Sequence, residues 1–207
     1  MGFGDFKKIV DMLFYNPQRF VRKHKNIRID ETSILLNSAR FIFNNSKTKN
    51  NITIGKGSMI GCQFIFESER GEISVGDRTF INGNTKIISR SKISIGSDVT
   101  IAWDCTIYDH NSHSIDWRLR RQDIKQQLED YKNSNNFIAN KNWDVVKSKP
   151  IIIEDKVWIG FGSTILSGTT IGEGAIIGAM SVVREDVEPW TVIAGNPPHV
   201  LYKIDNR

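Results

Sequence analysis

Four histidines are the side chains of this sequence best suited to moving protons near neutral pH, namely His24, His110, His113 and His199. An imidazole with a pKa of about 6.5 is largely unprotonated at pH 7, so it can take a proton from a hydroxyl group, which is almost wholly un-ionised there. Two of the four lie close together in the chain, at His110 and His113. From the residues alone, His110 fits either a general base or a loop histidine with no part in proton transfer.

The elements expected to position these histidines belong to a repeat of six residues. From Ile153 onward an aliphatic residue returns at every sixth position, at Ile153, Ile159, Ile165, Ile171, Ile177 and Val183. A period of six fits neither an α-helix nor an ordinary strand. It matches a β-solenoid in which about 18 residues make one coil of three flat faces and the aliphatic residues stack inside. The spacing recurs less regularly at Ile54, Ile60, Phe66, Val75, Ile81, Ile87, Ile93, Ile95, Ile101 and Ile107.

The totals bound the class of protein. A chain of 207 residues can form one domain with a cap, and 28 Lys and Arg against 23 Asp and Glu give a formal charge of +5. The basic residues are spread along the chain rather than gathered in one tract, and we expect no nucleic-acid partner. We find no apolar run near 18 residues and no signal peptide. Together with two cysteines expected to be reduced packing residues, Cys62 and Cys105, this favours a cytoplasmic protein.

The repeat is interrupted after Ile107 by a polar excursion over residues 108–149, which begins at the two neighbouring histidines. Excursions of this length from a regular stack are more often functional than idle. Inside it, Trp117–Tyr131 is predicted to be helical. Near the C-terminus, residues 185–198 are expected to leave the coil and residues 200–204 to form a short helix or strand.

The first residues are predicted to form a separate helical segment, 1–26, which Pro17 divides into two short helices. Two functions fit this segment. It can cap the open end of the solenoid, or it can lie as a basic amphipathic helix on a membrane surface. Residues 27–204 are then the solenoid domain. Its first part, 27–50, has looser spacing and is expected to be an imperfect stack.

Three stretches together resemble the left-handed β-helix acyltransferases: Ile153-Glu-Asp-Lys-Val-Trp-Ile-Gly160, the hexads after it, and Ala194-Gly-Asn-Pro-Pro-His-Val200. The chain is similar to the galactoside, maltose and xenobiotic O-acetyltransferases and to the O-acetyltransferases of capsule and lipopolysaccharide synthesis. The resemblance covers 75–207 well and 27–74 weakly. It implies an all-β fold, a left-handed parallel β-helix, with acetyl-CoA as co-substrate, a sugar or glycan acceptor, and a homotrimer whose active sites lie between subunits.

The resemblance implies roles on the acceptor side. His110 matches the catalytic histidine of the family motif and would be the general base that later protonates the CoA thiolate; His113 matches a second histidine expected to contact the acceptor or support the structure. Asn82 matches an acceptor-binding amide, although a corner asparagine fits as well. Arg90 or a neighbour stands where the family has an acidic residue, and a guanidinium suits a carboxylated or phosphorylated acceptor. Asp109 and a backbone carbonyl are both candidates to orient His110.

On the donor side, the resemblance implies contacts with CoA from Trp158, Gly160, Gly178, Ala179, Arg184 and Lys203. The tryptophan matches one beside the pantetheine arm. The glycines and the alanine match positions where small residues let the backbone approach that arm. The two cations are the nearest for the nucleotide phosphates, although the basic residues common in the family at the end of the repeat are replaced here. No metal is expected.

Three alternatives stay open. An N-acetyltransferase acting on an amino sugar or a nucleotide-linked amino sugar would also need a base beside CoA. A γ-type carbonic anhydrase shares the fold but needs three histidines around a metal, whereas only His110 and His113 cluster here. A non-catalytic scaffold would not bind acetyl-CoA. The sequence favours acetyl-CoA-dependent O-acetylation of a glycan or glycan precursor in the cytoplasm, with contact at the inner face of the membrane left open.

Overall fold

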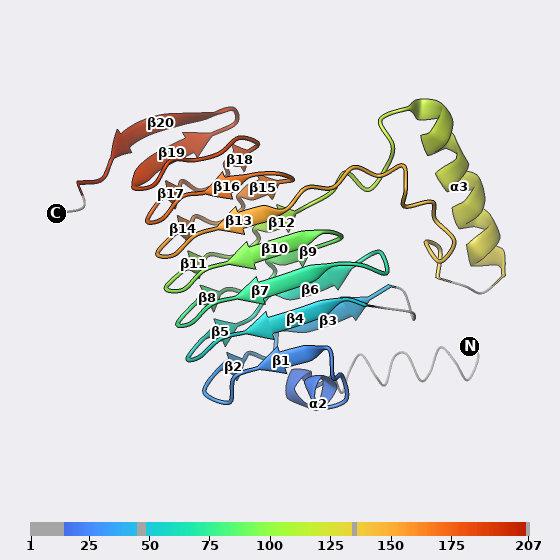
Figure 1. Ribbon diagram of the computed structural model, residues 1–207, viewed down its shortest axis with the longest axis horizontal. Coiled ribbons are helices and arrows are strands. Elements are labelled where there is room, and N and C mark those ends of the chain that lie inside the picture. The colour runs from blue at the N-terminus through green and yellow to red at the C-terminus, as the bar shows by residue number, and fades with distance from the viewer. Residues whose placement is uncertain (1–14, 45–48, 134–135, 206–207) are drawn as a thin grey trace.

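The chain winds into a stack of coils with three flat faces, which Figure 1 shows from the side. The structure is a computed structural model that describes residues 15–44, 49–133 and 136–205. Every third strand of the stack belongs to the same sheet and pairs in parallel with its predecessor. This is the arrangement of a parallel β-helix, and it confirms the solenoid predicted from the period of six.

The strands form three sheets, which we call sheets A, B and C in the order in which each coil visits them. Sheet A consists of β1 (Ile27–Ile29), β4 (Asn51–Ile54), β7 (Glu72–Val75), β10 (Lys92–Ile95), β13 (Ile151–Ile153) and β16 (Thr170–Ile171). Sheet B consists of β2 (Ile34–Leu35), β5 (Met59–Ile60), β8 (Phe80–Ile81), β11 (Thr100–Ile101), β14 (Trp158–Ile159), β17 (Ile176–Ile177), β19 (Thr191–Gly195) and β20 (Pro198–Lys203). Sheet C consists of β3 (Arg40–Phe43), β6 (Gln63–Phe66), β9 (Lys86–Ile88), β12 (Thr106–Tyr108), β15 (Thr164–Leu166) and β18 (Val182–Val183).

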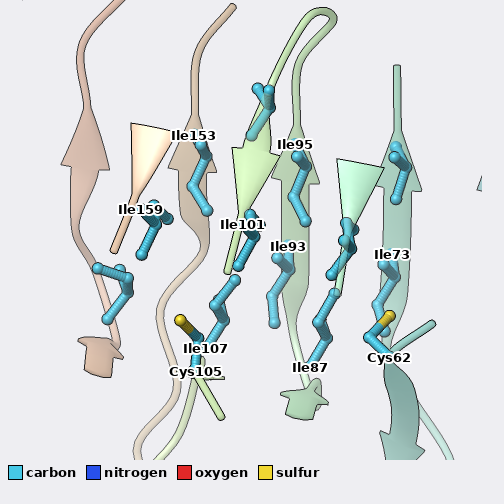
Figure 2. Packing of buried hydrophobic residues seen from close by; sticks show 14 of the residues in the cluster. Cys62, Ile73, Ile87, Ile93, Ile95, Ile101, Cys105, Ile107, Ile153 and Ile159 are labelled. Carbon is cyan, nitrogen blue, oxygen red and sulfur yellow. The ribbon is translucent and has the colours of Figure 1, made fainter. Parts of the chain in front are cut away.

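The core is a set of columns of aliphatic side chains inside the coils (Figure 2). The six hexad residues from Ile153 to Val183 are each at most 1% exposed, as the period predicted. The strands pair in register, so each inward residue stacks on its copy in the next coil; Ile87, Ile107 and Ile165 form one such column. Full burial of an aliphatic side chain contributes about 1.5–3 kcal/mol, which makes these columns the main stabilising feature of the fold.

The strands of the first coils already pair in parallel with those of the next coil, although the sequence predicted an imperfect stack here. Ile27 pairs with Ile52 in sheet A, so the stack already begins at β1. In sheet C the inward positions of β3 and β6 hold phenylalanines instead of aliphatic residues. Phe41 stacks on Phe64 with ring centroids 5.3 Å apart. The first coil is also 25 residues long, from Ile27 to its partner Ile52, rather than about 18, which explains why the period was weak in this part of the sequence.

The N-terminal helical segment is described only from residue 15, and the larger part of the segment predicted over 1–26 lies outside the described residues. The described part contains α2 (Pro17–Val21), whose N-cap side chain, Asn16, accepts a hydrogen bond from the backbone N–H of Arg19 at 2.8 Å. Phe20 stacks on Phe41 at 5.8 Å and packs against the core. This helix therefore covers the first coil, where a solenoid needs a cap.

The excursion leaves the stack after β12 and returns at β13. It contains α3 (Trp117–Lys132), capped by Asp116, where the sequence predicted a helix. In Figure 1 this helix lies outside the stack of coils. Across the described ranges, no helix is long and apolar enough to cross a membrane.

The C-terminal end differs from the prediction that residues 185–198 leave the coil. Strand β19 pairs in parallel with β17, matching Ile177 with Ile193, so sheet B continues to Gly195. Strand β20 then folds back antiparallel on β19. The prediction was wrong because the last coil is shorter than the others: its inward residue follows Ile177 by 16 positions rather than 18, which breaks the phase of the repeat.

Candidate active site

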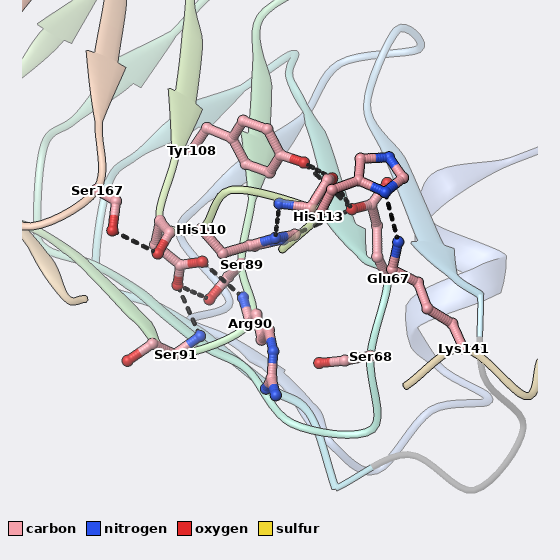
Figure 3. Close-up of polar contacts among 12 residues, drawn as sticks. Glu67, Ser68, Ser89, Arg90, Ser91, Tyr108, His110, His113, Lys141 and Ser167 are labelled. Carbon is pink, nitrogen blue, oxygen red and sulfur yellow. Dashed lines mark hydrogen bonds and ion pairs between the residues drawn. The ribbon is translucent and has the colours of Figure 1, made fainter. Parts of the chain in front are cut away.

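Three polar side chains gather at the corner where sheet C hands over to sheet A (Figure 3). The inward residues Phe64, Ile87 and Ile107 pair in register across β6, β9 and β12. Three positions after each of them come Glu67, Arg90 and His110. Corners of a β-helix stack as its strands do, so these three side chains lie on successive coils of one edge. We call this edge the C–A corner. The sequence analysis predicted His110 and Arg90 as site residues but missed Glu67. Its position three residues after the inward Phe64 is the signal that could have identified it.

The imidazole of His110 is enclosed by the excursion and by its own coil. Its side chain is fully buried. The ring of Tyr108 meets it edge-on at 4.5 Å, and the ring of Trp143 meets it in the same way at 5.7 Å. A β-bridge between His110 and Ser148 holds the returning end of the excursion beside it. The excursion predicted to shape the site therefore also covers the histidine.

The two ring nitrogens of His110 have different neighbours. Nδ1 accepts a hydrogen bond from the backbone N–H of Ser112 at 3.1 Å, so the proton of the neutral ring is on Nε2. Nε2 is buried, and no described atom lies within hydrogen-bond distance of it. Its neighbour is Oε2 of Glu67 at 3.6 Å. The same carboxylate oxygen accepts from the hydroxyls of Ser112 at 3.2 Å and Tyr108 at 3.4 Å.

Electrostatics keep this ring neutral. Burial, followed by the positive charges of Arg90 and Lys141, lowers the pKa of His110 to about 3. The contact with Glu67 therefore joins a neutral imidazole to a carboxylate and is not an ion pair at neutral pH. Burial raises the pKa of Tyr108 to about 12, so its hydroxyl stays protonated and can donate to Glu67.

Asp109 precedes His110 but does not orient it. Its carboxylate is fully buried and accepts three hydrogen bonds of 2.8 Å, from the hydroxyl of Ser89 and the backbone N–H groups of Arg90 and Ser91. Burial raises the pKa of this carboxyl, and the three donors oppose that rise. Asp109 thus fixes the turn that carries Arg90 and has no exposed face for a substrate. A backbone N–H, rather than this carboxylate or a carbonyl, occupies Nδ1 of His110.

Arg90 lies between the corner and the excursion. Its guanidinium carbon is 5.5 Å from the centroid of the Trp143 ring, and the group donates to the Trp143 carbonyl. Its Nε is buried without an acceptor among the described atoms. Beside it is a small pocket of about 140 Å³, lined by Ser68, Glu69, Arg70, Arg90, Trp143 and Asp144. Trp143 therefore contacts both the pocket and the ring of His110.

His113 ties the excursion together instead of facing the ring of His110. Its Nδ1 is 2.6 Å from a carboxylate oxygen of Asp123, which is buried on α3. The ammonium of Lys141 reaches the same oxygen at 3.0 Å. This cluster joins α3 to the returning part of the excursion and supports a structural role for His113.

The small residues expected on CoA lie at a different edge, which we call the B–C corner, and Asn82, which was expected on the acceptor, lies there too, away from His110 and Arg90 of the same chain. Asn82, Gly160 and Gly178 each follow the last residue of a sheet B strand, and those strands are in register. A Cβ on Gly160 would come within 2.6 Å of the backbone nitrogen of Ala179, and one on Gly178 within 2.7 Å of the Ala194 side chain. Stacking of the coils therefore requires both glycines, whatever binds there. The side-chain oxygen of Asn82 accepts only the N–H of its own neighbour, Gly83.

Large side chains are exposed beside this column of small residues. Trp158 on sheet B is 52% exposed, as its predicted outward position requires. Trp103, Phe161 and Met180, which the sequence reasoning missed, follow the B–C corner and are 54–65% exposed. Backbone hydrogen bonds link Phe161 to Met180 and Trp103 to the residue after Phe161, so the three lie on neighbouring coils.

The two cations expected to bind phosphates are exposed near the C-terminal end. Arg184 follows β18, and Lys203 pairs with Glu188 at 2.9 Å. One chain therefore holds His110 and Arg90 at the C–A corner, and Asn82 and the small residues at the B–C corner. It does not bring the two groups together.

Comparisons with known proteins agree with the fold and the motifs. Residues 150–185 match the family model described as bacterial transferase hexapeptide (six repeats). The galactoside O-acetyltransferase of Escherichia coli is 30% identical over 75% of this chain and 65% of its own length. The hexapeptide-repeat acetyltransferase VCA0836 of Vibrio cholerae, solved in complex with acetyl-CoA, is 30% identical over 79% of this chain and 73% of its own, with a TM-score of 0.54.

A more distant likeness shows the fold alone. AntD of Bacillus cereus, an N-acyltransferase solved with dTDP and 3-hydroxybutyryl-CoA, is 20% identical over 92% of this chain and 89% of its own, with a TM-score of 0.64. The chain spans 55–65% of the length of the curated relatives that it matches over most of its own sequence. Throughout the described parts of the chain, no group of three or more His, Cys, Asp or Glu is placed to hold a metal. With a left-handed β-helix built from these repeats and a relative of this identity and coverage, the chain belongs to the hexapeptide-repeat acetyltransferases.

Proposed function

We propose that the protein transfers an acetyl group from acetyl-CoA to a hydroxyl of a sugar or of a cell-surface polysaccharide precursor, with His110 as the general base. The observation that carries this proposal is the neutral imidazole at the C–A corner, with a carboxylate beside one nitrogen and a single hydrogen bond on the other. A relative named for galactoside O-acetylation and another solved with acetyl-CoA support it.

The geometry suggests how the proton moves. The lone pair of His110 is on Nδ1, where the backbone N–H of Ser112 now binds, and an acceptor hydroxyl would replace that donor. As the hydroxyl oxygen attacks the thioester carbon, its proton passes to Nδ1. The carboxylate of Glu67, beside Nε2–H, stabilises the positive charge of the imidazolium that forms. The C–S bond then breaks, and the imidazolium returns the proton to the thiolate. The products are an acetyl ester and CoA.

Two features of the site have to change before this step. The ring of Trp143 covers one edge of His110, so it has to move to admit an acceptor. A pKa of about 3 keeps the histidine unprotonated but makes it a weak base. Negative charge that develops on the tetrahedral oxygen during transfer favours the imidazolium, and this raises the basicity of His110 when it is needed.

The acceptor is proposed to carry a carboxylate or phosphate. The guanidinium of Arg90, with an unpartnered buried Nε, lines the pocket next to Trp143, and Arg70 lines it too. A planar guanidinium binds such groups through paired hydrogen bonds. Glu69 and Asp144 line the same pocket, so an anion there would be held by the directed hydrogen bonds of the guanidiniums rather than by a net positive charge, and Trp143 connects this pocket to the ring of His110.

The donor is proposed to lie along the B–C corner of a neighbouring subunit. Trp158, Gly160, Gly178 and Ala179 line that corner, whereas His110 is at the C–A corner of the same chain. A site that uses both groups needs two chains. A homotrimer of β-helices side by side, as the resemblance implies, supplies such a pairing.

The test follows free CoA thiol released from acetyl-CoA with a panel of neutral, carboxylated, phosphorylated and amino sugars. His110→Asn is expected to lower kcat/KM about 10²–10⁴-fold, because the base is lost while the shape is kept. His199→Asn, at an exposed histidine on β20, is the matched control and should leave turnover unchanged. Undiminished turnover in His110→Asn would overturn the assigned base. Failure to bind acetyl-CoA would favour the scaffold, and transfer to amino sugars alone would favour N-acetylation.

A further inference from the structure

The helix α3 exposes its apolar side chains and buries two of its three acidic residues. Trp117, Ile124, Leu128 and Tyr131 are 54–75% exposed. The helix has two buried residues, Asp123 and Asp130. This reverses the usual pattern of a surface helix, whose apolar stripe faces the core. The apolar surface of α3 is therefore unpartnered within the described part of the chain.

The four exposed apolar residues form one stripe. They are spaced by seven, four and three positions, and at 3.6 residues per turn such spacings return to the same side of a helix. Two residues of the stripe are Trp and Tyr, which have an apolar body and a polar tip. In Figure 1 the helix lies outside the coils, and the exposed fractions of the four side chains show that the stripe is open to solvent.

Cations surround the stripe, and two of the three acidic residues of α3 are held on the other side. Five basic residues of α3 are exposed, namely Arg118, Arg120, Arg121, Lys125 and Lys132. Arg121 lies over the ring of Trp117 at 5.6 Å, directly beside the stripe. Asp123 is bound by Lys141, and Asp130 accepts from the backbone and side chain of Asn140. Both aspartates thus face the returning excursion. The exposed surface of α3 carries the apolar stripe, these five cations and one acid, Glu129.

We propose that α3 is an interfacial helix that docks the protein on the surface of an anionic lipid bilayer. Aromatic and aliphatic side chains flanked by Arg and Lys are the composition that binds at the boundary between headgroups and acyl chains. Five exposed cations complement the negative headgroups of such a bilayer, and a second copy of this chain on the stripe is an outcome that the test distinguishes. This assigns the membrane contact to the excursion, and it does not depend on the proposed transfer reaction.

The experiment is co-sedimentation of the full chain with vesicles of phosphatidylcholine, with and without phosphatidylglycerol. Binding is expected only with the anionic lipid and should weaken as salt is added. Ile124→Glu should lower the affinity about tenfold or more, because it removes an apolar anchor and adds a like charge to the membrane. Ile152→Glu is the matched control: this isoleucine is 43% exposed on sheet A and should have no effect.

Three results would overturn the proposal. One is the absence of binding to anionic vesicles at low salt. Another is equal binding by Ile124→Glu and the unchanged protein, with circular dichroism showing that both are folded. The third is a change of oligomeric mass in Ile124→Glu with vesicle binding intact, which would assign the stripe to a second copy. A blue shift of tryptophan fluorescence on vesicles that Trp117→Phe abolishes would place the stripe itself in the lipid.

Discussion

At the scale of single residues, the sequence predicted that a histidine, His110, is the catalytic candidate, but it did not predict which residues surround it. The position of His110 at the break in the repeat was visible, and so was the guanidinium of Arg90. The role of Asp109 was not, because its neighbours Ser89 and Ser91 belong to the preceding coil. Glu67 is 43 positions before His110 and becomes its neighbour only through the register of sheet C. Predicting which residues meet across coils requires knowing how far each insertion shifts the repeat, and local sequence patterns do not show that.

The burial of His110 predicts a dependence of stability on pH. Its pKa is about 3 in the folded protein against 6.5 for a free imidazole, so below pH 6.5 the unfolded chain binds a proton that the folded chain does not. Stability from this residue is complete above about pH 6.5 and is lost as pH falls, by about 1.4 kcal/mol per unit. Between pH 7.5 and 5 the unfolding free energy should drop by about 2 kcal/mol more in the unchanged protein than in His110→Asn. Urea titrations at both pH values check this, and parallel losses in the two proteins would contradict it.

At the scale of elements, the hexads predicted the strands because the inward residue of each coil is its strongest signal. The helix in the excursion was also predicted, since its composition differs from the repeat. The final coil was missed because its shortened turn shifts the phase, and the first coils were underestimated because the first of them is 25 residues long. Periodicity therefore identifies elements well where spacing and residue type are both regular, and poorly where either one changes.

Neighbouring residues of β13 give a direct test of the inward column. Ile151 is fully buried and Ile152 is 43% exposed, although they have the same side chain and backbone. Ile151→Ala should cost about 2–5 kcal/mol of unfolding free energy, because it opens a cavity between stacked coils. Ile152→Ala should cost about 1 kcal/mol or less. Equal urea midpoints and slopes for the two variants would show that the column does not carry the stability.

At the scale of the whole molecule, the positions of the C–A and B–C corners determine how copies of the chain would have to pack to form one site. The proposed base and the proposed donor residues lie on different edges of one chain, so under the proposed function an active unit would need a second chain to complete it. The sequence predicted the residues of both groups but not that the two groups lie on different edges of the chain. That separation arises because one group follows strands of sheet C and the other follows strands of sheet B. The sheet to which each strand belongs is known only when the strands before and after the excursion are assigned to their coils.

Mixing experiments can test a shared site. The protein should sediment at about 71 kDa, three times the chain mass of 23.6 kDa. His110→Asn removes the base, and Ala179→Trp, at an exposed position, should block the donor corner. Each variant alone should be inactive, whereas trimers refolded from a mixture should regain part of the activity, since some interfaces pair an intact histidine with an intact corner. No recovery on mixing, or a monomeric mass, would contradict the shared site.

The stacking of the C–A corner also sets a length scale for regiochemistry. Glu67, Arg90 and His110 stand on successive coils, and neighbouring strands of a sheet are about 4.8 Å apart. That rise is close to the length of a sugar ring. The corner therefore acts as a ruler graduated in coils, and moving the guanidinium by one graduation would slide an anchored acceptor by about one ring. Under the proposed function, the next sugar of the glycan would then meet the histidine, and the number of coils between the guanidinium and the histidine would select which sugar is acetylated.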